Sequence, residues 1–187
     1  MSQQEVPPVD PRPLPGEPLS LDLLNTRWNG AEGPCDLLDS LDGLGQWLAL
    51  NGFADRVPAD RAAQEALVAT RAALAELVGG KGGEDAEAGR AALNAVLAHG
   101  ALHRTLTADG PVEQVQVDDP AWLAAWSAAA DYLRLLGEAP DRIRICAHPD
   151  CVLHFYDTSK NGTRRWHAMA SCGNRAKASR HYARSKA

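Results

Sequence analysis

Residues 142–187 read RIRICAHPDCVLHFYDTSKNGTRRWHAMASCGNRAKASRHYARSKA, and this stretch contains three of the four cysteines of the 187-residue chain. Four residues separate Cys146 from Cys151, four separate His167 from Cys172, and fifteen lie between the two pairs. Zinc prefers four tetrahedral sulfur and nitrogen ligands, and two short chelating loops can bring such ligands together at modest entropic cost. The spacing therefore predicts one structural zinc ion bound by Cys146, Cys151, His167 and Cys172.

The fourth ligand has two competitors in the same stretch. His148 lies between the first two cysteines and His154 follows Cys151 by three residues, so either could replace His167. We favour His167, because only this residue restores two pairs of equal spacing. Reduced, buried thiols without a metal are a further interpretation, but the stretch has too few apolar side chains to build a core around them. We therefore expect the module to need its metal in order to fold. Cys35 stands alone in the acidic body and is predicted to be an inert, small hydrophobic residue.

Turn-forming and strand-forming residues indicate how the ligands are connected. Residues 149–150 suit a tight turn, residues 152–156 are rich in strand formers, and residues 160–162 form a second turn that leads back toward the second ligand pair. Helix-compatible residues follow the last cysteine to about Arg184. The pattern predicts a treble-clef-like or ribbon-like zinc finger with a C-terminal basic helix.

The charge of the chain is divided unevenly between its two parts. Residues 141–187 carry ten Lys and Arg against three Asp and Glu, whereas residues 1–140 carry nine against twenty-one. The two parts therefore have formal charges of about +7 and −12, which is typical of a polyanion-binding tail on an acidic body.

The cations of the tail are the candidate nucleic-acid contacts. A solvated surface or an interaction with the acidic body is the alternative interpretation. DNA is the expected partner, RNA is not excluded, and Trp166, beside a predicted ligand, is expected to pack rather than to stack on a base. The predicted contact residues are Lys160, Arg164, Arg165, Arg175, Lys177, Arg180 and Arg184.

The acidic body is predicted to be mainly α with one β-hairpin, an α+β fold. Apolar periodicity predicts helices over 37–48, with Asp36 as N-cap, over 60–78, and over a third segment ending near residue 100. Alternating runs on either side of Asp109-Gly110 predict the hairpin. Asp119-Pro120 then opens a helix whose predicted apolar stripe comprises Trp122, Trp126, Ala129, Leu133 and Leu136. The segment 19–28 is predicted to be a short strand or an ordered entry segment.

These patterns predict three parts along the chain. Residues 1–18 are proline-rich and are expected to be disordered, residues 19–140 form the acidic helical body, and residues 141–187 form the finger. The chain has no long apolar run and no signal-peptide pattern at its start, and its cysteines suit a reducing compartment. We therefore expect a cytoplasmic protein.

The tail resembles a known family. Its C-x4-C spacing followed by RRWHAMASCGNRAKASRHYAR is similar to the CGNR zinc finger, which takes its name from residues 172–175, and LDLLNTRW at 21–28 resembles the start of the ABATE domain that commonly precedes this finger. The resemblance implies a bacterial, stress-linked transcription regulator with a zinc-dependent, DNA-binding finger. In the family the residue after the Trp is usually a cysteine. Here it is His167, which would make the site Cys3His, with one less negative charge at the metal.

The leading functional hypothesis is therefore a regulator whose finger binds DNA while the body senses a small-molecule ligand, forms a homodimer, or restrains the finger. A second hypothesis is a protein-interaction module whose basic finger binds an acidic partner. The third is an enzyme with a pocket in the body, for which His99 and His103, with Asp109 or Glu113 nearby, are the weak candidates. Four protein ligands would leave the zinc no open position for catalysis, so we expect no enzymatic activity.

Overall fold

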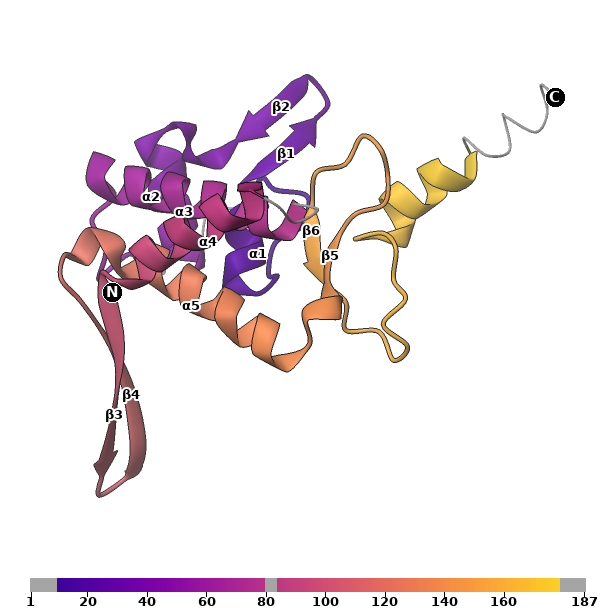
Figure 1. Ribbon diagram of the computed structural model, residues 1–187. Helices are drawn as coiled ribbons and strands as arrows, with labels where there is room; N and C mark the ends of the chain where they lie inside the picture. Colours follow the sequence, from indigo (N-terminus) through magenta and orange to yellow (C-terminus); the bar gives the residue numbers. More distant parts are fainter. Residues whose placement is uncertain (1–9, 80–83, 179–187) are drawn as a thin grey trace, which may run out of the picture.

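The computed structural model describes residues 10–79 and 84–178 (Figure 1). The helices are α1 (Leu19–Leu24), α2 (Leu41–Leu50), α3 (Arg61–Gly79), α4 (Glu84–Leu97) and α5 (Leu123–Glu138). Shorter helical turns are η1 (Leu37–Asp39), η2 (Pro120–Trp122), η3 (Pro140–Arg142) and η4 (Met169–Gly173). The strands pair as antiparallel hairpins: β1 (Arg27–Gly30) with β2 (Gly33–Asp36), β3 (Gly100–Thr107) with β4 (Gly110–Val117), and β5 (Ile143–Ile145) with β6 (His154–Tyr156).

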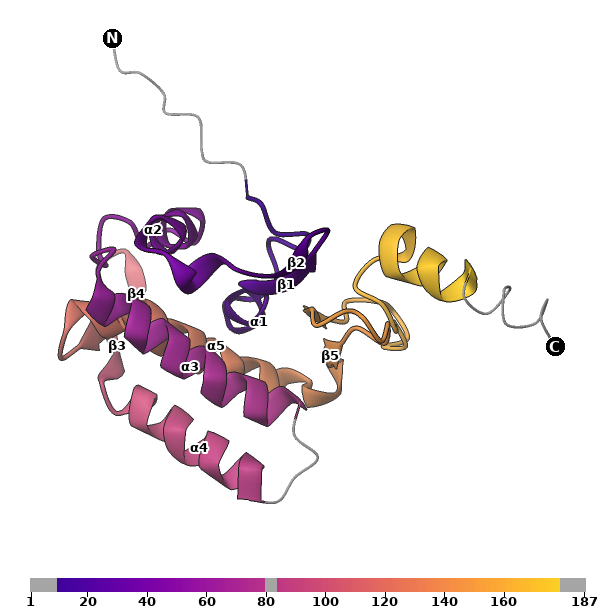
Figure 2. The same cartoon turned by 90° about the horizontal axis from the view of Figure 1, so that it is seen from above.

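The body consists of packed helices in layers. Figure 2 shows α3 and α5 side by side, with α4 on one side of them and α1 and α2 on the other. The three long predicted helices and the Asp109-Gly110 hairpin are confirmed as α3, α4, α5 and β3–β4. The predicted helix over 37–48 divides into two, because Asp36 caps η1 and Ser40 accepts from the Gly43 N–H to cap α2.

The segment 19–28 is ordered, but the strand predicted for it begins only at Arg27, because residues 19–24 form helix α1. The apparent alternation arises because the helix is buried on all sides, so its polar residues have partners in the interior. Asp22 is 2% exposed and accepts hydrogen bonds from Arg12 Nη1 at 2.7 Å and from Trp47 Nε1 at 2.8 Å. The Ser20 hydroxyl donates to Asp131 on α5. Such satisfied polar groups can lie in a core at little cost.

Residues 10–18 were expected to be disordered, but they lie against the body. Arg12 is 5% exposed and binds both Asp10 and Asp22, so a salt-bridge network orders this segment where apolar burial could not. The remaining nine residues of the predicted disordered segment, 1–9, lie outside the described residues, as do 80–83 and the end of the predicted basic helix, 179–187.

The apolar stripe predicted for α5 is partly wrong. Trp126 and Ala129 are buried as expected, but Leu133 and Leu136 are 47% and 38% exposed. The buried face instead includes Ala124, Ala125, Ala128, Tyr132 and Leu135. Small alanines permit close helix packing, and the predicted stripe included only Ala129 among the four alanines that α5 buries.

The hairpin β3–β4 extends from the body at the end opposite the zinc-finger region (Figure 1). The two histidines of the enzyme hypothesis, His99 and His103, lie on either side of Gly100, the first residue of strand β3. Helix α4 ends at Leu97, so His103 lies on the exposed strand β3, whereas His99 stacks on Trp122 and pairs with Asp118. The two imidazoles therefore do not share a helix face.

The strands β5 and β6 attach the C-terminal region to the body. Ile143 and Tyr156 pack against the hydrophobic core of the body. The Asn25 side chain accepts from the His154 N–H at 2.8 Å and donates to the His154 carbonyl oxygen at 2.9 Å. Glu17 accepts from the Tyr156 N–H, and Asn29 donates to the Asp150 carbonyl oxygen. None of the helices within residues 10–79 and 84–178 is long and apolar enough to cross a membrane.

The buried Asp22 network gives a stability prediction. Asp22→Ala should lower the free energy of unfolding by about 3 kcal/mol, because Trp47 loses its acceptor and Arg12 loses one of its two carboxylates. Urea denaturation followed by tryptophan fluorescence measures the change. The exposed Asp55→Ala is the control and should change stability by less than about 0.5 kcal/mol. Equal effects of the two substitutions would contradict the structural role of Asp22.

Candidate metal centre

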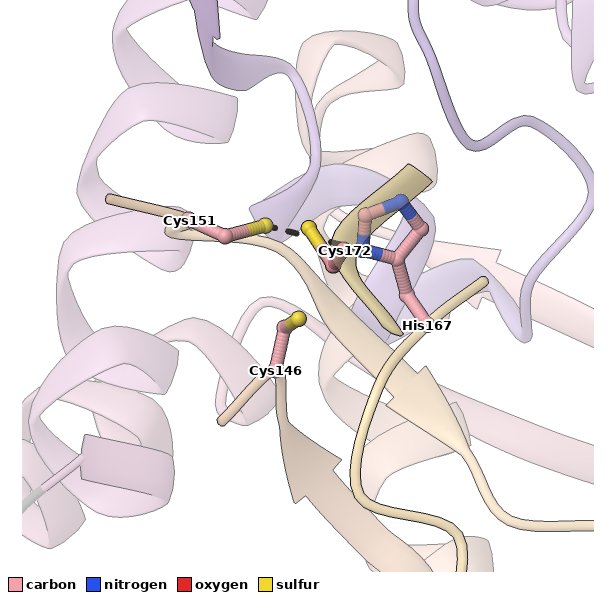
Figure 3. A group of neighbouring side chains, drawn as sticks. All are labelled: Cys146, Cys151, His167 and Cys172. Carbon is pink, nitrogen blue, oxygen red and sulfur yellow. Dashed lines mark hydrogen bonds between the residues drawn. The ribbon is translucent and has the colours of Figure 1, made fainter. Parts of the chain in front are cut away.

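The side chains of Cys146, Cys151, His167 and Cys172 converge on one point (Figure 3). Their potential ligand atoms all lie within 4.8 Å of one another. Cys151 Sγ and His167 Nδ1 are 3.5 Å apart. A tetrahedral zinc ion with ordinary Zn–S and Zn–N bonds places a sulfur and a nitrogen ligand about 3.5 Å apart. The cluster is therefore positioned to bind a metal and fits one zinc ion with Cys3His ligands.

Two segments bring the ligands together. The first two ligands lie in the loop between β5 and β6, and residues 146–151 of this loop are called the knuckle. Cys146 follows β5 and Cys151 precedes β6, so the pairing of these strands fixes both ends of the knuckle. Within the knuckle the Cys151 N–H donates to the His148 carbonyl oxygen, and the Ala147 N–H donates to the Arg165 carbonyl oxygen of the second segment. His167 lies just before η4 and Cys172 lies within it. A knuckle, a hairpin and a ligand in the first helical turn form the predicted treble-clef-like arrangement.

The electrostatics of the cluster favour a cation. Burial is the main cause that raises the pKa of the Cys151 thiol to about 12, and the neighbouring sulfurs of Cys146 and Cys172 contribute to the rise. Three close thiolates would repel one another, whereas a divalent metal ion stabilises them and displaces their protons. Burial, with the charges of Arg164 and Arg175, lowers the pKa of His167, which keeps its imidazole neutral as metal binding requires.

Two neighbouring side chains support the ligands. Ser171 Oγ lies 3.3 Å from His167 Nε2, the ring nitrogen that faces away from Cys151, and so helps to orient the imidazole. Arg175 Nη2 donates to Cys172 Sγ at 3.2 Å, so the arginine of the CGNR sequence contacts a predicted zinc ligand. Such outer contacts tune metal affinity. Neither role was predicted from the sequence, although Ser171 follows His167 by four residues and Arg175 follows Cys172 by three, which are helical spacings.

The two competing histidines lie outside the cluster. His148 is buried, and its Nδ1 accepts from the Asp150 N–H at 3.2 Å. His154 begins strand β6 and is not grouped with the three sulfurs. Cys35 is half-buried on β2, far from the cluster in the sequence. The structure thus brings together the four residues that the spacing predicted.

The five predicted nucleic-acid contacts that the structure describes fall into two groups. Lys160, Arg165, Arg175 and Lys177 are exposed. Arg164 is half-buried: its guanidinium lies over the Phe155 ring, 4.5 Å from the centroid, and donates to the Trp166 and His167 carbonyl oxygens. Arg164 therefore holds the second ligand segment. Arg180 and Arg184 lie outside the described residues.

Trp166 is half-buried, and the Arg165 guanidinium lies 5.3 Å from its ring centroid. The indole therefore carries a cation on its surface. The ring is only partly packed, so the expectation that Trp166 packs rather than stacks on a base stays a prediction.

Comparisons with known proteins agree with this geometry. A family model described as "CGNR zinc finger" matches residues 142–185, and a model named ABATE and described as "Putative stress-induced transcription regulator" matches residues 17–139. The second match covers well over half of the chain. Neither description names an enzymatic family. A search of curated proteins finds no match to this chain.

Metal content tests the ligand cluster. The purified protein should contain about one zinc per chain, and Cys172→Ser should abolish this content because three ligands remain. Cys35→Ser is the matched control, since this cysteine lies outside the cluster, and it should retain the metal. Elemental mass spectrometry measures both variants. Stoichiometric zinc in Cys172→Ser would show that the cluster is not the site.

The contact of Arg175 with Cys172 gives a separate prediction. Arg175→Gln should weaken zinc binding by about tenfold, because the sulfur loses a charged hydrogen-bond donor. Competition with a chromophoric chelator measures the affinity. Lys177 is exposed two residues further along the same helix, and Lys177→Gln should leave zinc affinity unchanged. The interpretation fails if both variants release zinc equally.

Proposed function

We propose, from the premise that this chain belongs to the ABATE family and carries a CGNR zinc finger, that it is a bacterial transcription regulator whose finger binds DNA. The observation that carries the proposal is the group of exposed cations beside the metal cluster. Arg165 precedes the second ligand pair, and Arg175 and Lys177 follow it. Exposed guanidinium and ammonium groups so placed suit phosphate contacts.

The metal would give this surface its shape. Cys172 lies within η4, and helical residues continue to 178, so a metal bound by Cys172 fixes where the helix begins. Without the metal, the few buried apolar residues of the finger would not hold the helix against the knuckle. DNA binding should therefore require zinc. The exposed Lys160, together with Arg180 and Arg184, would extend the contact surface, whereas Arg164 would support it from inside.

The body would control the finger through the contacts that join them. Asn25 of the body holds both backbone polar groups of His154, and Glu17 holds the Tyr156 N–H. A change in the body would therefore be transmitted to β6 and to the knuckle before it. Ligand sensing and restraint of the finger both fit this connection. Homodimerisation remains a prediction that light scattering of the purified protein can test. A regulator of this kind would act in the cytoplasm.

A salt titration tests the nucleic-acid interface. The zinc-loaded protein should bind duplex DNA, with an affinity that falls steeply as salt rises. The double variant Arg165→Gln, Lys177→Gln should bind more weakly, and the slope of log K against log salt should decrease in magnitude by about 2. Arg61→Gln is the control, because Arg61 is an exposed cation on helix α3 of the body. Fluorescence anisotropy measures all three proteins.

Absence of DNA binding at low salt, with one zinc bound, would contradict the proposal. The same surface could then serve an acidic protein partner, which is the second hypothesis. Affinity capture with and without nuclease distinguishes the two, because a partner bound through nucleic acid is released by the nuclease and a directly bound protein is not.

A further inference from the structure

A cleft of about 180 Å³ lies where the body meets the zinc finger. The body contributes Leu24 at the end of α1, Arg27 on β1, and one side of α3. The finger contributes Val152 and His154. The cleft is thus formed by both parts of the chain, and it lies outside the metal cluster.

The cleft has an excess of positive charge. Arg71 is 4% exposed and makes two hydrogen bonds of 2.6 Å to the Asp36 carboxylate. Arg27 donates to the same carboxylate through Nε only. Two guanidinium groups therefore share one carboxylate. Within the described part of the chain, the terminal nitrogens of Arg27 have no hydrogen-bond acceptor, and they suit a second, external carboxylate.

His154 lines the cleft on the finger side. Its Nδ1 is buried and has no hydrogen-bond partner among the described residues. Because this nitrogen is closed to solvent, His154 lines the cleft without offering Nδ1 to a ligand, and the accessible polar group is the Arg27 guanidinium. Asn25 fixes the backbone of His154 on both sides, which keeps the imidazole in place.

The remaining lining is apolar and accessible. Val68 of the body and Val152 of the finger are 36% and 44% exposed, and Leu24 is 4% exposed. Ala72 and Ala75 on α3 also line the cleft, and their small, exposed side chains leave it open. Apolar walls with a few convergent polar groups are typical of small-molecule sites. A ring or a short aliphatic chain bound in the cleft would contact this apolar lining.

We propose that this cleft binds a small monocarboxylate with a compact apolar body, whose carboxylate is bound by the terminal nitrogens of Arg27. A cavity of about 150 Å³ is known to hold benzene, so the cleft has the right size for an aromatic ring or a chain of similar volume. The binding claim is independent of DNA. Its regulatory consequence, a change in the position of β6 and the finger, rests on the function proposed above.

Isothermal titration of the full-length, zinc-loaded protein with benzoate tests the site. Benzoate should bind at one site per chain with a Kd no weaker than about 1 mM. Benzamide has the same shape without the charge and should bind at least about tenfold more weakly. Arg27→Gln removes the external donor, and Ala72→Leu fills the cleft from an exposed position; each should weaken benzoate binding by about tenfold or more. Arg61→Gln is the matched control on α3 and should bind benzoate normally.

The proposal would be overturned if no benzoate bound at about 10 mM, which is ten times the weakest expected Kd. It would also be overturned if Arg27→Gln, Ala72→Leu and the unmodified protein bound benzoate equally. Equal affinity for benzamide would also overturn it, because charge would then play no part. DNA affinity is measured separately with and without benzoate. Benzoate binding without any DNA binding would support the site and refute the regulator, whereas DNA binding without benzoate binding would do the reverse.

Discussion

The structure of the C-terminal region depends on bringing three cysteine sulfurs and one imidazole to a single point. Few large apolar residues there are buried; Leu153 and Phe155 are the main ones in the described part of the finger. Such a small core cannot offset the entropy of ordering two loops and a helix. Clustered thiolates would repel one another without a cation. Zinc removes the repulsion and joins the knuckle to the helix, so metal binding and folding of this region should be one event.

The same region is also fixed to the body. Ile143 and Tyr156 reach its core, and Asn25 pairs with the backbone of His154 as a neighbouring strand would. Asn25 in turn follows the buried helix α1, whose Asp22 is bound by Arg12 and Trp47. The family boundary near residue 140 therefore separates two sequence units, while the contacts across it connect them physically. In the proposed regulator, these contacts would transmit an event in the body to the finger.

Much of this arrangement could be predicted from local sequence. Ligand spacing identified the Cys3His cluster, and capping residues such as Asp36 and Asp119 located helix starts, because these features depend on neighbours in the chain. Helix α1 could not be identified, since its polar residues have partners more than ten positions away, such as Asp131 for Ser20. The interior role of Arg164 was hidden for the same reason. Its charge suggested a phosphate contact, whereas the fold places its guanidinium over Phe155.

Zinc K-edge X-ray absorption of the purified protein tests the central claim most directly. The account predicts one zinc with three sulfur ligands at about 2.3 Å and one nitrogen ligand at about 2.0 Å, and no bound water. The nitrogen contribution should be lost in His167→Cys, which restores the fourth cysteine usual in the family. A first shell of oxygen and nitrogen atoms without sulfur, or a protein that folds completely with no zinc, would contradict the account.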